Sequence, residues 1–434
     1  MSEEGGEPTR RRRRSRSPPA AADSLPDDDD LLREILLRLP PQPSSLPRAS
    51  AVCKRWQRLA TDPKFLRCFI AHHRKPPLLG YFKYVVTGLV FTPVLDPPDR
   101  IPPARLHCII PDTDGAPRDK QFLGCRHGRV LVMDRVRKEV LICDPITGGK
   151  HCVTAPPEFT RNSVYGEVVC AAADRGHVHG SCHSSPFKVV LMSLTEDHNW
   201  SIARVYSSET GIWGNLITTA VPSDIYGASI TGTLVGNALY WLLLMTDDIL
   251  EFDLGGQEIS VLRILEFDLD LQSLAVIMGP PSTYDFLSYT RQIIRAEDGA
   301  LGLVIFSYPS IQVWHREVDC HGVATWLLYK TIRKHKILGL PQIERGRTAM
   351  QCMLGYSEDT NAIFIIIDFT VYMVQLKSMQ SKRLHEIDFR DIANYYPFTS
   401  FYTPVIFLKL YLLATDLQLS SLIQFFSLEI LLIA

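Results

Sequence analysis

The sequence lacks the short motifs that mark the common nucleotide-binding, zinc-dependent and serine-dependent enzymes. None of the patterns GxxxxGK[ST], GxGxxG, HExxH or GxSxG occurs in its 434 residues. Each of these patterns places backbone N–H groups on phosphate, two histidines on zinc, or a serine on a sharp turn. We therefore expect a protein that is not an enzyme, with no catalytic residue, no cofactor and no metal.

A strong charge of one sign and paired cysteines are also missing. The formal net charge is −1, with 46 Lys and Arg against 47 Asp and Glu, which argues against binding nucleic acid or an acidic membrane with the whole surface. The 10 cysteines are scattered singly, without a CxxC pair, and the start of the chain is rich in arginine rather than resembling a secretory leader. We expect reduced thiols and a location in the nucleus, the cytoplasm or both.

The first 24 residues have the composition of a disordered segment. They combine Gly, Pro, Ser and Ala with a basic run from Arg10 to Arg14 plus Arg16. Such a segment buries too little apolar surface to offset the entropy of ordering. The basic run is consistent with a nuclear import signal, a weak RNA contact or a solvated tail.

Residues 25–75 carry helical periodicity and predict three short helices. The first has an acidic start at residues 27–30 and an end at Pro40, and its apolar stripe is Leu32, Ile35, Leu36 and Leu39. The stripe of the second is Leu46, Ala49, Val52, Cys53, Trp56 and Leu59. The third begins at Asp62 and Pro63, a cap followed by a proline at the first helical position. A domain this small gains stability from a partner.

Beyond residue 76 the apolar period changes to two, which predicts strands. Residues 128–144 predict a hairpin, and residues 239–253 and 362–376 show the same strand, turn and strand. Weaker copies begin near Tyr84, Lys188 and Leu301. Spacings of about 45 to 65 residues are typical of a kelch- or WD-like β-propeller with about five or six blades. We expect this propeller over residues 78–404, with a large β-sandwich as the alternative.

One loop contains residues of the kind that bind metals: His177, His179, Cys182 and His183. We interpret it as a polar loop between blades, because adjacent Cys182 and His183 fit poorly around one tetrahedral ion and the surrounding glycines and serines indicate flexibility. Four tryptophans lie in strand-like contexts, where packing in the core is the expected role; they are Trp213, Trp241, Trp314 and Trp326.

Residues 405–434 are apolar and carry only three charges, Lys409, Asp416 and Glu429. Three interpretations stay open: a helix that closes the domain, a non-native end, and a tail anchor. The longest uncharged run, residues 417–428, is shorter than the roughly 20 residues that span hydrocarbon. We therefore expect no membrane partner.

Residues 25–73 resemble the F-box. The resemblance rests on Leu25-Pro26, the acidic turn, the end Leu39-Pro40, and the later Val52-Cys53-Lys54-Arg55-Trp56. The continuation resembles a large plant group, especially of grasses, in which an F-box precedes a β-propeller-like domain. The sequences FLGC at 122–125, ICDPITG at 142–148 and FTSFYTP at 398–404 support it. The implied fold class is α+β multidomain: a small three-helix F-box followed by a large all-β domain.

The resemblance implies the substrate-recognition subunit of an SCF-type cullin E3 ubiquitin ligase. The F-box would bind a Skp-type adaptor and, through it, the cullin and RING subunits, while the β domain would hold an unidentified protein substrate. A receptor of this kind acts by proximity and needs no catalytic residue. The alternatives are a ligase-independent scaffold or interaction protein and a propeller enzyme. The implied adaptor-binding residues are Leu25, Pro26, Leu32, Ile35, Leu36, Leu39, Pro40, Leu46, Val52, Cys53 and Trp56.

Overall fold

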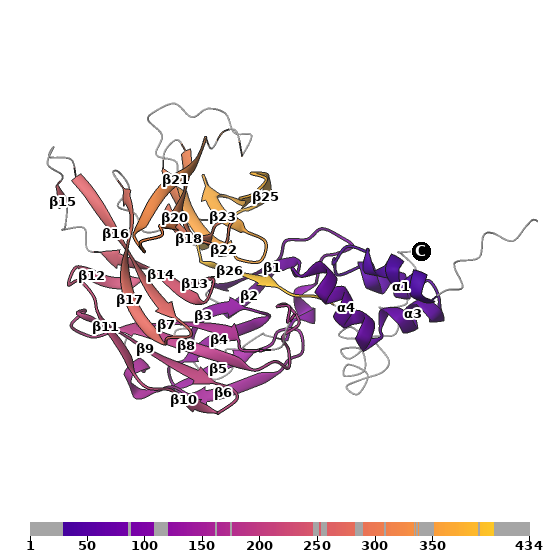
Figure 1. Cartoon of the computed structure of the whole chain (residues 1–434). Coiled ribbons are helices and arrows are strands. Elements are labelled where there is room, and N and C mark those ends of the chain that lie inside the picture. Colours follow the sequence, from indigo (N-terminus) through magenta and orange to yellow (C-terminus); the bar gives the residue numbers. More distant parts are fainter. Residues whose placement is uncertain are drawn as a thin grey trace, which may run out of the picture.

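A computed structural model shows a small helical domain beside a large ring of β-sheets (Figure 1). The structure describes residues 29–85, 88–107, 120–160, 163–173, 176–245, 251–252, 258–282, 290–307, 310–333, 335, 337, 351–388 and 391–402. The predicted disordered segment 1–24 and the apolar tail 405–434 lie outside these residues. Within them, no helix is long and apolar enough to cross a membrane.

The helical domain contains four helices: α1 (Asp29–Leu37), α2 (Ser45–Ser50), α3 (Lys54–Ala60) and α4 (Pro63–His73). Their apolar faces form one core, which consists of Leu32, Leu36, Leu46, Ala49, Leu59, Phe65, Leu66 and Phe69. The start of α4 follows the sequence expectation: the Asp62 side chain accepts a hydrogen bond from the backbone N–H of Lys64 at 3.0 Å, and Pro63 takes the first helical position.

The prediction of one helix over residues 46–59 was wrong. Cys53 adopts an extended backbone, with φ −163° and ψ 168°, and divides the segment into α2 and α3. Val52 and Cys53 lie exposed at this corner, although the periodicity placed both on a buried stripe. The turn allows Leu46 and Leu59 to reach the same core from two short helices.

Six sheets follow in the described residues. One contains β26 (Tyr395–Thr399), β1 (Leu78–Val85) and β2 (Gly88–Pro93). The second contains β3 (Lys120–Arg126), β4 (Arg129–Asp134), β5 (Glu139–Cys143) and β6 (Lys150–Thr154). The third contains β7 (Val164–Cys170), β8 (Phe187–Leu194), β9 (Trp200–Ser207), β10 (Ile212–Trp213) and β11 (Ile217–Ala220).

The fourth sheet contains β12 (Ile225–Ala228), β13 (Thr233–Val235), β14 (Ala238–Met245), β15 (Glu251–Phe252), β16 (Glu258–Asp268) and β17 (Ser273–Ser282). The fifth contains β18 (Arg291–Arg295), β19 (Leu301–Ser307), β20 (Ser310–Val318) and β21 (Ala324–Arg333). The sixth contains β22 (Gln351–Ser357), β23 (Ala362–Ile367), β24 (Thr370–Gln375) and β25 (Ser381–Glu386). Among the residues that the structure describes, two 3-10 turns lie in loops: Pro103–Arg105 and Pro157–Phe159.

These sheets are the blades of a six-bladed β-propeller. Neighbouring sheets contact one another around the ring, for example through β3 with β7 and β22 with β26. The ring closes because β26, near the end of the described chain, pairs antiparallel with β1, as Figure 1 shows in yellow and indigo. Closure leaves few exposed sheet edges, which an all-β domain of this size must otherwise protect. The six blades exclude the β-sandwich alternative.

The hydrophobic core lies between the blades. Leu131 and Val140 from the second sheet pack with Val168, Val189 and Leu191 from the third. Such apolar burial is the main favourable contribution to folding. The tryptophans pack as predicted: Trp241 is fully buried, and Trp213, Trp314 and Trp326 are half-buried against apolar clusters.

Five of the six predicted hairpins are confirmed. β4 pairs with β5 and β23 with β24, and the weaker copies near Tyr84, Lys188 and Leu301 are the pairs β1–β2, β8–β9 and β19–β20. The hairpin predicted over residues 239–253 was wrong, because β14 pairs with β16 and β15 also pairs with β16. Two apolar runs on either side of a turn predict strands, but they do not determine which strands pair.

Candidate adaptor surface and propeller channel

The helical domain exposes apolar side chains on α1 and at the corner between α2 and α3. Leu31 and Ile35, one turn apart on α1, are 48% and 41% exposed, and Val52 is 56% exposed. The opposite face of α1 is buried through Leu32 and Leu36. An apolar side chain gains free energy when a partner removes it from water, so these three positions suit a protein contact.

The implied adaptor-binding residues divide into three groups. The exposed group is Ile35, Pro40, Val52 and Cys53. The group within or against the helical core is Leu32, Leu36, Leu39, Leu46 and Trp56. Leu25 and Pro26 lie outside the described residues. The exposed residues are therefore directly accessible to a partner, whereas the core residues hold together the helices on which the exposed residues lie.

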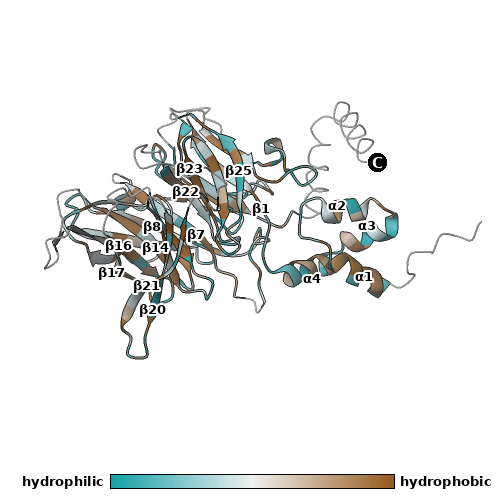
Figure 2. Ribbon diagram, turned by 90° about the horizontal axis from the view of Figure 1, so that it is seen from above, coloured by the Kyte–Doolittle hydropathy of each residue, from teal (hydrophilic) through white to brown (hydrophobic). Residues whose placement is uncertain are grey.

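The helical domain is attached to the propeller on the side of β1 (Figure 2). The backbone N–H of Ser44, at the start of α2, donates to Oδ1 of Asp99 in the loop after β2 at 2.9 Å. After α4, Pro76 and Pro77 are buried, and the carbonyl of Pro77 accepts a hydrogen bond from the N–H of Ser400 at 3.3 Å. These contacts connect the helical domain to the loop after β2 and to the residue that follows β26.

A buried ion cluster crosses the central channel of the propeller. The guanidinium of Arg126, at the end of β3, donates to Glu167 of β7 at 2.6 Å and to Glu358, after β22, at 2.7 and 2.9 Å. It also donates to the carbonyl of Gly232 at 2.9 Å. The carboxylates accept further bonds at 2.7 Å, Glu167 from the N–H of Gly232 and Glu358 from that of Leu234. The cluster therefore joins four of the blades.

Burial dominates the electrostatics of this cluster. Desolvation, opposed by the attraction of Arg126 and increased by repulsion from Glu358, raises the pKa of Glu167 to about 7. The neighbouring cavity is small, about 50 Å³, and polar residues including Gln292, Asp359 and Thr399 line it. Because all three charged side chains bind one another or backbone groups, the geometry supports a clamp between blades.

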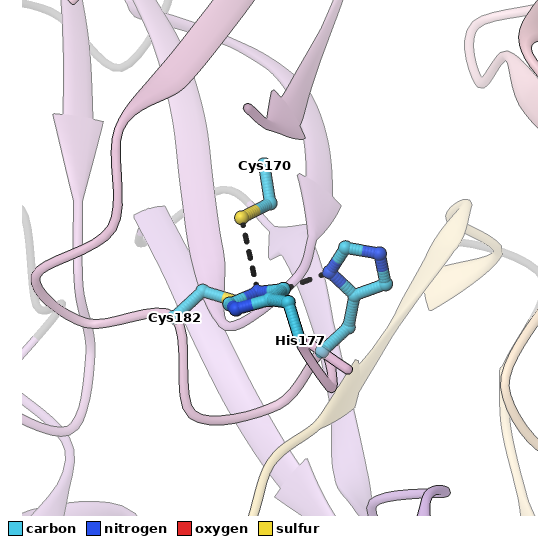
Figure 3. A group of neighbouring side chains, drawn as sticks. Cys170, His177 and Cys182 are labelled. Carbon is cyan, nitrogen blue, oxygen red and sulfur yellow. Dashed lines mark hydrogen bonds between the residues drawn. The ribbon is translucent and has the colours of Figure 1, made fainter. Parts of the chain in front are cut away.

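In the structure, the candidate metal-binding residues of the loop between β7 and β8 differ from the four named in the sequence. His183 is not one of them, since its Nδ1 lies 2.6 Å from Oδ2 of Asp144. Cys170, the last residue of β7, joins His177, His179 and Cys182 instead. Figure 3 shows Cys170 and Cys182 converging on His177. The sequence reasoning missed Cys170; its position at a strand end, just before the histidine-rich loop, was the available signal.

Helices with an F-box pattern joined to a six-bladed propeller define the class of F-box proteins with a propeller recognition domain. An F-box domain model matches residues 23–68. A second model, described as "F-box protein AT5G49610-like, beta-propeller", matches residues 121–406. This match extends over more than half of the chain, which therefore belongs to that family. Proteins of this kind are, in general, substrate-recognition subunits of SCF ubiquitin ligases.

Other comparisons give only distant likeness. No curated protein matches the chain. The calcium-binding protein regucalcin from Agrobacterium tumefaciens str. C58 shares 10% identity and a TM-score of 0.33, over 63% of this chain and 73% of that one. A chain of the nidogen/laminin complex shares 9% identity with a TM-score of 0.36, over 73% of this chain and 96% of that one. The chain spans 28% of the extracellular domain of a one-component system from B. thetaiotaomicron, at 13% identity and a TM-score of 0.30 over 62% of this chain. Scores this low carry no functional argument.

Proposed function

We propose that this chain is the non-catalytic substrate receptor of an SCF-type ligase, with its helices on a Skp-type adaptor and its propeller on a target protein. The observation that carries the proposal is the F-box match on a helical domain that exposes apolar side chains while burying its own core. The adaptor would in turn connect the chain to cullin and RING subunits. Transfer of ubiquitin then depends on holding the target close to the charged carrier.

We assign the adaptor contact to the exposed residues Ile35, Pro40, Val52 and Cys53 together with Leu25 and Pro26. Leu32, Leu36, Leu39, Leu46 and Trp56 complete the set by supporting the helices, and the half-buried Leu39 and Trp56 also border the contact. The distinction follows from burial: Leu36 is fully buried whereas Val52 is 56% exposed. Truncating exposed contact residues should weaken binding without unfolding the domain.

The test is capture of a Skp-type adaptor by the full-length chain and by Ile35→Ala/Val52→Ala. If Ile35 and Val52 are anchors of the interface, each truncation costs about 1 to 2 kcal/mol, so the double variant should bind more than about tenfold more weakly. Val136→Ala/Leu271→Ala is the matched control, because Val136 and Leu271 are 67% and 77% exposed on the propeller. Leu25→Ala/Pro26→Ala tests the remaining predicted contact.

Two results would contradict the proposal. One is a failure of the unmutated chain to capture the adaptor under conditions in which a known F-box protein captures it, which would favour the ligase-independent scaffold. The other is equal weakening by the propeller control. The substrate is to be identified by affinity purification and mass spectrometry, with the helical domain alone as background. A nuclear or cytoplasmic location and an origin in grasses, both implied by the sequence, belong to the same proposal.

A further inference from the structure

The loop between β7 and β8 gathers four metal-binding side chains at one point. The candidate ligand atoms of Cys170, His177, His179 and Cys182 all lie within 4.8 Å of one another. Nε2 of His177 lies 3.3 Å from Sγ of Cys170 and 3.2 Å from Sγ of Cys182. Nδ1 of His179 lies 3.6 Å from Sγ of Cys182. Figure 3 shows the three labelled residues of this group.

These distances match the edges of a tetrahedral zinc site. With bonds of about 2.3 Å to sulfur and about 2.0 Å to nitrogen, a tetrahedron places sulfur and nitrogen about 3.5 Å apart. The three sulfur–nitrogen distances, 3.2 to 3.6 Å, bracket this value. Two thiolates and two imidazoles form a donor set that favours zinc, and two thiolates neutralise its charge. Three of the six distances between ligand atoms therefore already have the length that a tetrahedral zinc site requires.

The surroundings hold the ligands in place. The N–H of Cys170 donates to Nδ1 of His127 at 3.0 Å, and the His127 ring stacks on His179 with 3.7 Å between centroids. Arg129 donates to the backbone carbonyls of Cys182 and Ser185. Hydrogen bonds and ring contacts to the ligand residues fix the orientation in which those residues meet a metal ion. The cluster is thus fixed from β7, the β3–β4 turn and β4.

The same loop touches both ends of the propeller. The carbonyl of Gly180 accepts from the N–H of Phe401 at 2.9 Å and from Oγ of Ser400 at 3.0 Å. Gly180 has a φ of +97°, and a Cβ there would lie 2.6 Å from Pro76, so the contact requires glycine. Pro76 precedes β1 and Phe401 follows β26, the two strands that close the ring. A ligand that fixes the β7–β8 loop would therefore also stabilise the junction at which β1 and β26 close the ring.

We propose that Cys170, His177, His179 and Cys182 bind one Zn²⁺, which clamps the β7–β8 loop against the junction of the helical domain and the propeller. Four protein ligands close the coordination sphere, which is typical of structural rather than catalytic zinc. The site goes beyond the proposed receptor function, because adaptor capture depends on the helices.

The first test measures metal in the untagged full-length chain, grown with zinc and purified without chelator. We expect about one zinc per chain by elemental mass spectrometry. After replacement with cobalt, the absorption spectrum should show the intense ligand-field bands of a tetrahedral site and a thiolate-to-cobalt charge-transfer band. Zinc at the level of the buffer, a cobalt spectrum without thiolate ligation, or a Cys170–Cys182 disulfide in chain purified under nitrogen would each overturn the proposal.

Variants assign the ligands. Cys170→Ser and His177→Asn should lose at least tenfold in zinc affinity, while Cys143→Ser, a buried thiol on β5 outside the cluster, should keep the metal. Equal loss in Cys143→Ser would refute the assignment. If Cys170→Ser does not fold, the cobalt spectrum of the unmutated chain still shows whether thiolates bind the metal. Adaptor capture should be unchanged in Cys170→Ser, so that failure of this site and failure of the receptor function give different results.

Discussion

Replacing Arg126 with methionine should destabilise the propeller more than any exposed substitution. Methionine keeps most of the apolar stem, but it leaves Glu167 and Glu358, whose side chains are only 2% and 17% exposed, without their cation. Removing one partner from a buried ion pair costs about 3 to 5 kcal/mol. For a domain of about 300 residues, this corresponds to a fall in Tm of about 5 to 8 °C.

The destabilisation should also depend on pH, because Glu167 titrates near neutrality. Its pKa in the folded protein is about 7, above the usual 4.5, so the folded state binds the proton more tightly than the unfolded state. The contribution of this proton to the free energy of unfolding is fully present below about pH 4.5 and is lost as the pH rises through about 7. Without Arg126 the pKa rises further. The loss of Tm should therefore be larger at about pH 8 than at about pH 6.

Calorimetry of the full-length chain and Arg126→Met at both pH values is the assay. Arg204→Met is the matched control, because Arg204 also donates two bonds to one carboxylate, Glu158, and one to a carbonyl. The Arg204–Glu158 pair is about a quarter exposed, so its loss should cost about 1 kcal/mol or less. Equal losses for the two variants, or no dependence on pH, would refute the reasoning about the channel.

Two further substitutions test the helical domain and the ring closure. Asp62→Ala removes the cap that binds the N–H of Lys64 and should cost about 1 kcal/mol, measured by chemical unfolding of the helical domain; an unchanged midpoint would show that the cap is dispensable. Gly355→Ala should cost about 1 to 3 kcal/mol, because a Cβ there would lie 2.2 Å from the carbonyl of Tyr395. Gly149→Ala, with its nearest atom at 3.4 Å, is the control in thermal unfolding, and a matching loss of Tm there would contradict this argument.

Local patterns in the sequence predict local structure in this protein. Asp62 and Pro63 mark the start of α4, and the hairpins over 128–144 and 362–376 follow from apolar alternation across short turns. In the first of these, Oδ1 of Asp134 accepts the N–H groups of Val136 and Arg137 at 3.1 and 2.9 Å, which closes the turn. The partners in these elements are near in sequence, so composition and period are enough to predict them.

The sequence by itself therefore determined the helical segment near the N-terminus, the strands with their connecting turns, and the resemblance to the F-box. The tertiary structure decided which residues far apart in the sequence come into contact. Arg126 binds Glu358 across 232 positions, β26 pairs with β1, and Cys170 joins a histidine cluster for which the sequence suggested His183. Cys53 adopts an extended backbone that divides the helix expected from periodicity, and Leu46 and Leu59 reach one core from the two helices on either side of it. The reason is physical: periodicity reports which face of one element is apolar, but the choice of partner depends on how whole blades pack once the ring has closed.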